Sequence, residues 1–212
     1  MQKYLDLRED KDYTKLKDVA EIIKNCGIVV FPTETVYGIG ANGLDKDAVK
    51  RLYKVKQRPV DKAISLLVSN VEMIEQLAKD ITDMEYVLIK EFFPGPLTII
   101  LNKKDNVPDI VTAGGSTVGV RMPENEIALR LIEYGEVPIA APSANISGHP
   151  SGTELNTIID EFKENVDCYI DGGKSKIGVA STIVQVIDGV PHILREGSIT
   201  KEQIEEVCNR YK

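Results

Sequence analysis

The sequence has few of the residues from which a metal site or a disulfide framework could be built. Its 212 residues include three cysteines, Cys26, Cys168 and Cys208, and two histidines, His149 and His192. The cysteines are odd in number and lack C-x-x-C spacing, which argues against both a disulfide framework and a structural zinc site. The histidines are too few and too scattered for a zinc site of their own. We therefore expect reduced, packed cysteines and no metal held by protein ligands.

Long apolar segments are missing as well. The longest apolar runs, such as residues 28–31 and 97–101, fall far short of the roughly 18 residues needed to span a bilayer. Residues 1–9 carry too much charge for a secretory signal peptide. We therefore expect a cytoplasmic protein that has no membrane partner.

Positive charge is scarce over the whole chain, because 33 acidic residues outnumber 26 basic ones and the net charge is −7. This balance argues against a surface that binds nucleic acid throughout, so an anionic ligand would need a local basic patch. Residues 45–62 supply one, with seven basic and three acidic side chains. Lys46, Lys50 and Lys54 of this patch have the pattern of the solvated face of an amphipathic helix.

The second part of the basic patch points more directly to a ligand. Lys56, Arg58 and Lys62 lie beyond the helical pattern, and Pro59 disfavours helical geometry at Arg58. We therefore expect these three side chains to project from a loop. An arginine in an extended segment can donate two parallel hydrogen bonds to a phosphate or carboxylate, and a nearby lysine adds a mobile charge.

The composition is that of a folded globular chain. Hydrophobic residues make up 42% and charged residues 28% of the sequence, and we find no repeat, low-complexity tract or linker. We assign residues 1–212 to a single domain with a core of about residues 15–200. A last helix is expected at about residues 200–211, where Thr200 and Gln203 can form a capping box.

Apolar periodicity predicts alternating helices and strands. Leu16, Val19, Ala20 and Ile23 have helical spacing, with Gly27 in the place of a C-terminal cap. The β-branched run at residues 28–31 is typical of a strand buried on both faces. Further helices are expected after an N-terminal cap at Asp45 and at residues 71–77, 84–92, 127–134 and 153–163, and further strands at residues 64–68, 97–101, 117–120, 137–141, 169–170, 182–187 and 192–194. The alternation, with some adjacent strands, predicts an α/β or α+β fold built on an open sheet of mixed direction.

Two loops rich in polar residues follow predicted strands. One is residues 31–38, FPTETVYG, and the other is residues 141–152, APSANISGHPSG. The composition of the second loop fits an ordinary turn-rich segment in which Ser and Asn side chains bond to local backbone groups. Its position fits a binding site, because ligands of open α/β sheets lie beyond the carboxyl ends of the strands. The two loops could therefore share one crevice.

Other short motifs do not indicate a site. Gly173-Lys174-Ser175 matches the end of a phosphate-binding P-loop, but Cys168 occupies the position at which that loop requires glycine. The sequence also lacks the Ser, His and Asp signature of a hydrolase. The basic patch and the two polar loops remain as the candidates.

Six short motifs gain meaning when they are taken together. They are FPTETVYG at residues 31–38, KQRP at 56–59, PGPLT at 94–98, VRMP at 120–123, APSANISG at 141–148 and LREG at 194–197. In this order, over about residues 15–200, they closely resemble the YrdC-like threonylcarbamoyl-AMP synthase family. The combination of K-x-R at residues 56–58 with S-x-N at residues 143–145 is more specific than either motif alone. The likeness is to the short form of the family, which has no additional C-terminal domain.

The resemblance implies a YrdC-like fold, a twisted open mixed sheet with flanking helices around a large, concave, positively charged surface. It also implies an enzyme, a nucleotidyltransferase that converts L-threonine, bicarbonate or CO2, and ATP into threonylcarbamoyl-AMP and pyrophosphate. The product serves to modify adenosine 37 of tRNA. The implied partners are therefore tRNA or double-stranded RNA and the tRNA threonylcarbamoyl-transferase machinery. Mg2+ is expected to bind through the ATP phosphates and to keep several waters, without a set of protein ligands.

The resemblance also implies which residues form the site. It places catalysis at Lys56, Arg58, Ser143 and Asn145. It places ATP against Lys56, Arg58, Lys62, Thr117, Ser143, Asn145, Ser151 and Arg195. It places threonine near Pro32, Thr33, Thr35, Leu67, Arg121, Ala141 and Ser181. Phosphates bound without a P-loop need several cations, and transfer to a phosphorus depends mainly on positioning and charge neutralisation, so this set suits the reaction.

One departure from the family pattern concerns the amino acid. Leu67 stands where the family has a histidine beside threonine, so a hydrogen-bonding partner is lost, while Lys62 adds charge at the nucleotide end. We therefore expect ATP binding to survive and the affinity or selectivity for threonine to differ. The same departure leaves room for an alternative, an RNA-binding or regulatory paralogue that keeps the basic surface without synthesis.

Overall fold

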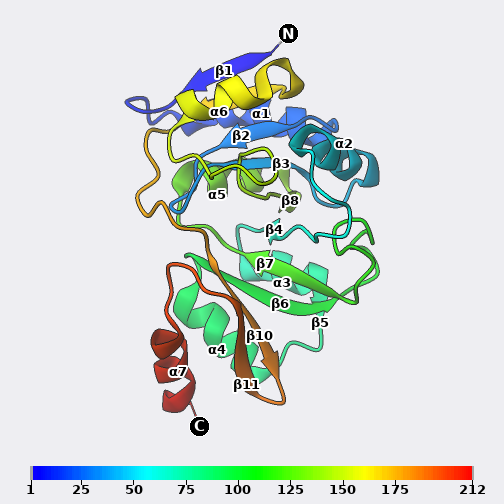
Figure 1. Ribbon diagram of the computed structural model, residues 1–212, viewed down its shortest axis with the longest axis vertical. Coiled ribbons are helices and arrows are strands. Elements are labelled where there is room, and N and C mark those ends of the chain that lie inside the picture. The colour runs from blue at the N-terminus through cyan, green and yellow to red at the C-terminus, as the bar shows by residue number, and fades with distance from the viewer. Residues whose placement is uncertain (1, 212) are drawn as a thin grey trace.

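The fold is an open β-sheet of mixed direction with helices packed around it, as the sequence predicts (Figure 1). The computed structural model describes residues 2–211. Within these residues eleven strands form the sheet in the order β1-β9-β2-β3-β8-β4-β7-β6-β10-β11, and β5 pairs with β6 off this path. The strands are β1 (Lys3–Asp6), β2 (Val29–Phe31), β3 (Gly38–Asn42), β4 (Leu66–Leu67), β5 (Ala78–Lys79), β6 (Leu97–Lys103), β7 (Thr117–Arg121), β8 (Ile139–Ala140), β9 (Cys168–Asp171), β10 (Thr182–Ile187) and β11 (Val190–Arg195).

Parallel and antiparallel pairs alternate irregularly across the sheet. β9 lies parallel to both β1 and β2, β4 lies parallel to β7, and β6 lies parallel to β10. The other pairs, including β2 with β3 and β6 with β7, are antiparallel. Most neighbours in the sheet are therefore distant in the sequence. This interleaving allows loops from many parts of the chain to meet at one place.

The helices lie against this sheet in two groups. They are α1 (Leu16–Lys24), α2 (Lys46–Lys56), α3 (Val71–Leu77), α4 (Asp83–Phe92), α5 (Glu126–Gly135), α6 (Leu155–Phe162) and α7 (Lys201–Arg210), with short 3-10 turns η1 (Tyr13–Lys15) and η2 (Lys163–Asn165). Figure 1 shows α1, α2 and α6 around the end of the sheet formed by β1, β2 and β3, whereas α4 and α7 lie beside β10 and β11. Within the groups, α1 packs against α5 and α4 packs against α7.

Two of the predicted helix starts are confirmed by their capping hydrogen bonds. Asp45 Oδ1 accepts from the backbone N–H groups of Asp47 at 2.8 Å and Ala48 at 3.0 Å. Thr200 and Gln203 form the predicted capping box, because each side chain accepts from the backbone N–H of the other. These bonds satisfy N–H groups that have no partner within the first turn of a helix.

The end of α1 differs from the prediction at Gly27. The residue with left-handed geometry is Cys26, with a φ of 60°. Gly27 is needed for a different reason, since a Cβ at this position would lie 2.3 Å from Ile22 Cγ2 and 2.6 Å from the Ile22 carbonyl oxygen. The close approach of the chain to Ile22, and not a positive φ, therefore requires glycine here.

Three strands are not predicted by the sequence pattern. β3 has the sequence GIGAN, in which glycine takes positions where strands favour β-branched residues. Gly40 must be small because a Cβ there would lie 2.4 Å from Ile139 Cγ2. β1 is a largely exposed strand at the end of the sheet, and β5 has two residues. The strand predicted at residues 64–68 is reduced to β4, and Ile64 instead donates its N–H to the Val111 carbonyl at 2.8 Å.

An ion pair joins α2 to Asp167, the residue before β9, near the start of the core strand β2, which is buried throughout as predicted. Arg51 Nη1 and Nη2 donate to the two carboxylate oxygens of Asp167 at 2.6 Å and 3.1 Å. The backbone N–H of Ile28 donates to the same carboxylate at 2.7 Å. Burial opposes ionisation of Asp167, but the bonds from Arg51 and Ile28 outweigh it and hold the pKa of this carboxyl below its ordinary value.

The cysteines agree with the prediction of a chain without disulfides. Cys168 and Cys208 are buried and Cys26 is half-buried, and no disulfide links them within residues 2–211. None of the helices in the same part of the chain combines the length and the apolar character that a bilayer crossing would need.

Candidate functional site

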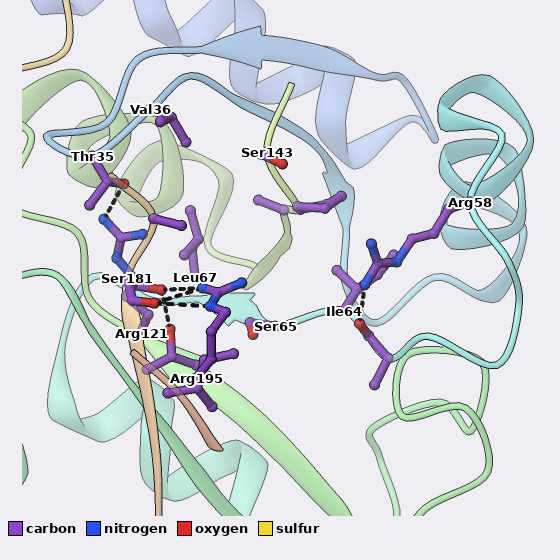
Figure 2. A pocket seen from close by; sticks show the side chains of 16 residues that line it. Thr35, Val36, Arg58, Ile64, Ser65, Leu67, Arg121, Ser143, Ser181 and Arg195 are labelled. Atoms are coloured by element: carbon purple, nitrogen blue, oxygen red, sulfur yellow. Dashed lines mark hydrogen bonds between the residues drawn. The ribbon is translucent and has the colours of Figure 1, made fainter. Parts of the chain in front are cut away.

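A cavity of about 170 Å³ lies where the two polar loops meet the middle of the sheet (Figure 2). Its walls come from the loop after β2, the segment between α2 and β4, strands β6 and β7, the loop after β8, and β10 with β11. The lining residues are Thr35, Val36, Arg58, Ala63, Ile64, Ser65, Leu67, Thr98, Arg121, Ala141, Pro142, Ser143, Ala180, Ser181, Ile183 and Arg195. Each of the six motifs singled out in the sequence contributes at least one of them.

Arg58 reaches the cavity from the segment that follows α2. Its Nε donates to the carbonyl oxygen of Lys62 at 2.9 Å, and its Nη2 donates to that of Ala63 at 2.7 Å. The guanidinium is thus fixed by backbone carbonyls of its own loop. The predicted loop position of Arg58 is confirmed.

Arg195 approaches from the opposite side of the cavity, next to Ser181 (Figure 2). It donates to the Ser181 carbonyl from Nη2 at 2.7 Å and from Nε at 3.2 Å. The Ser181 hydroxyl lies 2.9 Å from the hydroxyl of Thr98 on β6. Burial, followed by the nearby charges of Arg121 and Arg58, holds the pKa of Arg195 below its ordinary value. The charges of Arg121 and Arg58 therefore act on Arg195.

Arg121, at the end of β7, heads a chain of hydrogen bonds through the first polar loop. Its Nη2 donates to Thr35 Oγ1 at 2.9 Å, and its Nε donates to the Gly95 carbonyl at 3.3 Å. Thr33 Oγ1 donates to the Val36 carbonyl at 2.6 Å and lies 2.9 Å from Thr35 Oγ1. Since a hydroxyl has a single proton, Thr35 must be the donor to Thr33. The chain fixes the Thr35 oxygen next to the cavity.

Glu34 is a site residue that the sequence-based assignment omits. Its Oε2 lies 2.7 Å from Arg121 Nη2, and the two side chains are only 4% and 9% exposed. Within residues 2–211 the carboxylate of Glu34 accepts no hydrogen bond of good geometry, so the charge of Arg121 is its main partner. A single carboxylate inside a buried run of Thr, Val and Tyr is the signal that could have identified it.

The three arginines share one mode of attachment. Arg58, Arg121 and Arg195 each use Nε and Nη2 for protein partners. Among the residues that the structure describes, Nη1 of each has no hydrogen-bond acceptor, and no acidic side chain lines the cavity. The site therefore presents fixed N–H donors and a positive field to a ligand, which suits an anion.

The second polar loop presents Ser143 to the cavity and turns Asn145 inward. Ser143 Oγ donates to Asn145 Oδ1 at 2.5 Å. The amide nitrogen of Asn145 donates to the carbonyl oxygens of Ile146 at 3.0 Å and His149 at 2.8 Å. Asn145 is buried and does not line the cavity. Both earlier interpretations of the loop hold in part, because it caps itself and it also forms a wall of the site.

The structure corrects the prediction for Lys56. This residue is the last of α2 and is 2% exposed, so it does not project from a loop. Its ammonium donates to the carbonyl oxygens of Ser143 at 2.6 Å and Asn145 at 2.5 Å. Burial, and then the charge of Arg58, lowers the pKa of Lys56 to about 8, while Glu161 opposes the shift. The helix thus includes Lys56, one residue beyond the last apolar position of the pattern, Val55.

The remaining residues assigned from the resemblance divide into two groups. Leu67, Ala141 and Ser181 line the cavity together with Thr35 and Arg121. The other residues do not line it: Lys62 and Ser151 are exposed, Thr117 is half-buried at the start of β7, and Pro32 and Thr33 face a separate hollow beside Gly172. The cavity also includes Ser65, Thr98, Ala180 and Ile183, which the assignment omits. Thr98 could have been found, because it ends the PGPLT motif.

Metal binding by protein ligands has no candidate in this region. No group of three or more His, Cys, Asp or Glu side chains in residues 2–211 is arranged to hold a metal ion.

Lys62 is exposed, but its carbonyl accepts from both Arg58 Nε and the Tyr53 hydroxyl. Its backbone is therefore part of the scaffold while its ammonium stays in solvent.

Comparison with known proteins gives one consistent family. A family model named for Sua5, YciO and YrdC, with the description "Telomere recombination", matches residues 21–197. A threonylcarbamoyl-AMP synthase of Pyrococcus abyssi is 46% identical over 208 residues, which are 98% of this chain and 61% of that protein. The synthase of Bacillus subtilis is 42% identical over 194 residues, 91% of this chain and 56% of that protein.

A solved structure agrees with these matches. The crystal structure of P. abyssi Sua5 complexed with L-threonine superposes with a TM-score of 0.93 at 46% identity, covering 96% of this chain and 60% of that one. The chain therefore spans about three fifths of the length of these two curated relatives.

Proposed function

This chain belongs to the Sua5/YciO/YrdC family, and on that basis we propose that it is a threonylcarbamoyl-AMP synthase. The proposed reaction joins L-threonine, CO2 and ATP to give threonylcarbamoyl-AMP and pyrophosphate; bicarbonate as the carbon source would release one water in addition. The observation that carries the proposal is the convergence of Arg58, Arg121, Arg195 and Ser143 on one cavity. A substrate with phosphates and a carboxylate needs such a set of fixed cations and hydroxyls.

Threonine would occupy the end of the cavity formed by Arg121, Thr35 and Ser181. The Nη1 group of Arg121 would donate to the α-carboxylate, while Nη2 remains bonded to Thr35. Leu67 would face the methyl-bearing side of the amino acid as an apolar wall. This arrangement supplies a cation for the carboxylate and hydroxyls for the polar groups of the substrate.

ATP would extend from the cavity across its rim. The cavity is smaller than the roughly 300 Å³ of a pocket that holds a complete ligand of this size. We therefore place the α-phosphate by Ser143 and Arg195 and the β- and γ-phosphates by Arg58, with Lys62, Thr117 and Ser151 as outer contacts. Mg2+ would be carried on the phosphates, because the lining residues offer no carboxylate and do not fit a metal held by the protein.

The chemistry requires positioning more than acid or base catalysis. The threonine amine adds to CO2 and loses a proton, which gives a carbamate. A carbamate oxygen then forms a bond to the α-phosphorus, and the bond from that phosphorus to the bridging oxygen breaks as pyrophosphate leaves. Arg58 and Arg195 would stabilise the charge on the phosphates and on the departing pyrophosphate. No nucleophilic side chain of the protein is needed.

We also infer a place in tRNA modification, because threonylcarbamoyl-AMP is an activated donor that another enzyme must consume. tRNA and a threonylcarbamoyl-transferase are the proposed downstream partners. The relatives named as synthases support this role, and none of the comparisons supports the alternative of an RNA-binding module without synthesis.

Release of pyrophosphate tests the proposal directly. We expect release that requires ATP, L-threonine and bicarbonate together, and the matched variant Arg58→Met should reduce it by about tenfold or more. Arg130→Met, on the exposed face of α5, serves as the control and should leave the rate unchanged. Pyrophosphate that appears at the same rate without threonine would contradict the assignment.

A further inference from the structure

We propose that the K-x-R motif (residues 56–58) and the S-x-N motif (residues 143–145) each contain one residue that faces the ligand and one positioning residue. Arg58 and Ser143 face the ligand, and Lys56 and Asn145 are the positioning residues. In this proposal Lys56 and Asn145 hold the loop of residues 143–149, here called the S-x-N loop, in the shape that presents Ser143. The consequence for ATP rests on the proposed function. The hold of Lys56 and Asn145 on this loop, here called the clamp, rests only on contacts within the protein.

Lys56 holds the S-x-N loop at two points. Its ammonium donates to Ser143 O at 2.6 Å and Asn145 O at 2.5 Å, with a longer contact to Asn145 Oδ1 at 3.4 Å. Its backbone carbonyl accepts from the Ser147 N–H at 3.1 Å. An ammonium has three N–H donors, and these three acceptors occupy all of them. In this arrangement Lys56 has no donor left for a phosphate.

The side-chain amide of Asn145 likewise directs its hydrogen bonds to groups of the protein. Both N–H groups of its amide donate within the loop, to Ile146 O and His149 O. Its Oδ1 accepts from Ser143 Oγ at 2.5 Å and also contacts the Lys56 ammonium. The amide therefore connects the start, the middle and the end of the loop. Removing it would free Ser143 from its fixed orientation.

Other elements hold the far side of the S-x-N loop. Glu161 on α6 accepts from the Ile146 N–H at 2.7 Å and contacts His149 Nδ1 at 3.0 Å. The Ala144 N–H donates to the Tyr37 carbonyl at 2.7 Å. Glu161 also supplies the nearby negative charge that opposes the effect of burial on Lys56. The loop is thus held from α2, α6 and the first polar loop together.

Energetics favour a clamp over a mobile ligand contact. Withdrawal of Lys56 toward a phosphate would leave the carbonyls of Ser143 and Asn145 without their donor. A polar group left unsatisfied in a buried site is destabilising, and so is a buried ammonium with unused donors. Arg58 has no such conflict, because its Nη1 is unoccupied in the described part of the chain.

Amide hydrogen exchange of the ligand-free protein tests the clamp. The variants are Lys56→Met, Arg58→Met and, as the matched control, Lys54→Met on the exposed face of the same helix. We expect Lys56→Met to speed exchange of the Asn145 and His149 amides by about tenfold or more, because their protection depends on local opening. Arg58→Met and Lys54→Met should change it less than about twofold. Unchanged exchange in a folded Lys56→Met protein would overturn the proposal.

Acetylation of wild-type lysines keeps the proposal testable even if Lys56→Met does not fold. With acetic anhydride as the probe, we expect Lys56 to react at least about tenfold more slowly than Lys54, both with and without ATP. A lysine that holds the loop is protected from acetylation whether or not ATP is present. Equal reactivity of the two lysines without ATP, followed by protection of Lys56 when ATP is added, would instead show a direct phosphate ligand.

These outcomes are separable from those for the proposed function. Exchange and acetylation without ATP decide the clamp whether or not the protein binds nucleotide. Absence of ATP binding by the wild type would sink the synthase assignment alone. If ATP binds, both Lys56→Met and Arg58→Met should weaken it, but only Lys56→Met should also loosen the S-x-N loop of the empty protein.

Discussion

Glu34 and Arg121 form a buried ion pair in which Glu34 Oε2 lies 2.7 Å from Arg121 Nη2, at the end of the cavity proposed for threonine. Glu34 offsets part of the charge of Arg121, so Arg58 and Arg195 supply most of the positive field of the cavity. A substrate carboxylate would therefore meet a guanidinium that already has one anionic partner. Binding would depend on the Nη1 group, which has no hydrogen-bond partner among residues 2–211, and on the orientation that Glu34 imposes.

Replacing Glu34 by Gln should make the protein depend on its substrate for stability. The substitution keeps the shape but leaves the Arg121 charge unpaired, at a cost of about 3 kcal/mol. Added L-threonine would return a carboxylate to Arg121, so the increase in melting temperature caused by threonine should be larger in Glu34→Gln than in the wild type. Thermal unfolding with and without threonine measures this. The control Glu126→Gln removes an exposed partner of Arg130 and should behave as the wild type. Equal increases in all three proteins would contradict the prediction.

Gly197 of the LREG motif should not tolerate a side chain. A Cβ at this position would lie 2.3 Å from the Ala180 carbonyl oxygen and 2.5 Å from Thr182 N, and backbone atoms cannot move aside easily. We expect Gly197→Ala to displace the segment that carries Ser181, with a loss of about 1 to 3 kcal/mol in the free energy of unfolding. The affinity for threonine should fall as well. Gly189→Ala is the contrasting case. Alanine would be strained at the φ of 76° that glycine adopts here, but open space surrounds the position, so this substitution should affect stability alone. Calorimetric titration distinguishes the two variants.

Leu67 should limit the recognition of the threonine hydroxyl. This side chain is 3% exposed and lines the cavity with Thr35 and Ser181. Leu67→His would add a hydrogen-bonding group, so we expect several-fold tighter binding of threonine relative to valine. The buried imidazole should cost about 1 to 3 kcal/mol of stability. Titration of both amino acids with ATP present gives the ratio. An unchanged ratio, or strong threonine selectivity in the wild type, would show that Leu67 causes no loss.

Asp167 should account for part of the loss of stability in acid. Its pKa is held below the ordinary value of 3.8, so the folded state binds this proton more weakly than the unfolded chain does. The stabilisation is complete above the unfolded pKa and disappears as the pH falls through the lower folded pKa. At pH 7, Asp167→Asn should cost about 1 kcal/mol, because the pair with Arg51 is partly screened by solvent. The difference should vanish at low pH. Urea unfolding at both pH values measures it, and a constant difference would refute the assignment.

Much of the fold could be predicted from the sequence because its long elements obey simple patterns. The helices after Asp45 and Thr200 have both a cap and an apolar face, and apolar, largely β-branched residues predominate in the strands at residues 97–101 and 182–187. β3 was not predicted because its sequence is rich in glycine, and the close packing of Gly40 against Ile139 that requires glycine is visible only in the assembled sheet. The order of the strands depends on partners distant in the sequence, and local periodicity contains no information on that.

The candidate site was predictable in its cations and less so in their surroundings. Arg58, Ser143 and Arg195 meet in one cavity, as the motifs led us to expect. The prediction that Lys56 is exposed was wrong, because charge and a position near the end of a helix suggest exposure. The groups that bury its ammonium, the carbonyls of Ser143 and Asn145, lie 87 and 89 residues away in the sequence. Glu34 was overlooked because its importance depends on Arg121, which is 87 residues away in the sequence.

The shared attachment of Arg58, Arg121 and Arg195 has a consequence for turnover. Donors that are fixed before any ligand arrives cannot relax when the reaction is over, and pyrophosphate presents the same oxygens to Arg58 that ATP does. The fixed arginine donors that bind ATP would thus also retain pyrophosphate, the leaving group. Departure of that dianion or trianion, helped by competing salt, would then set the pace of the catalytic cycle more than bond formation does.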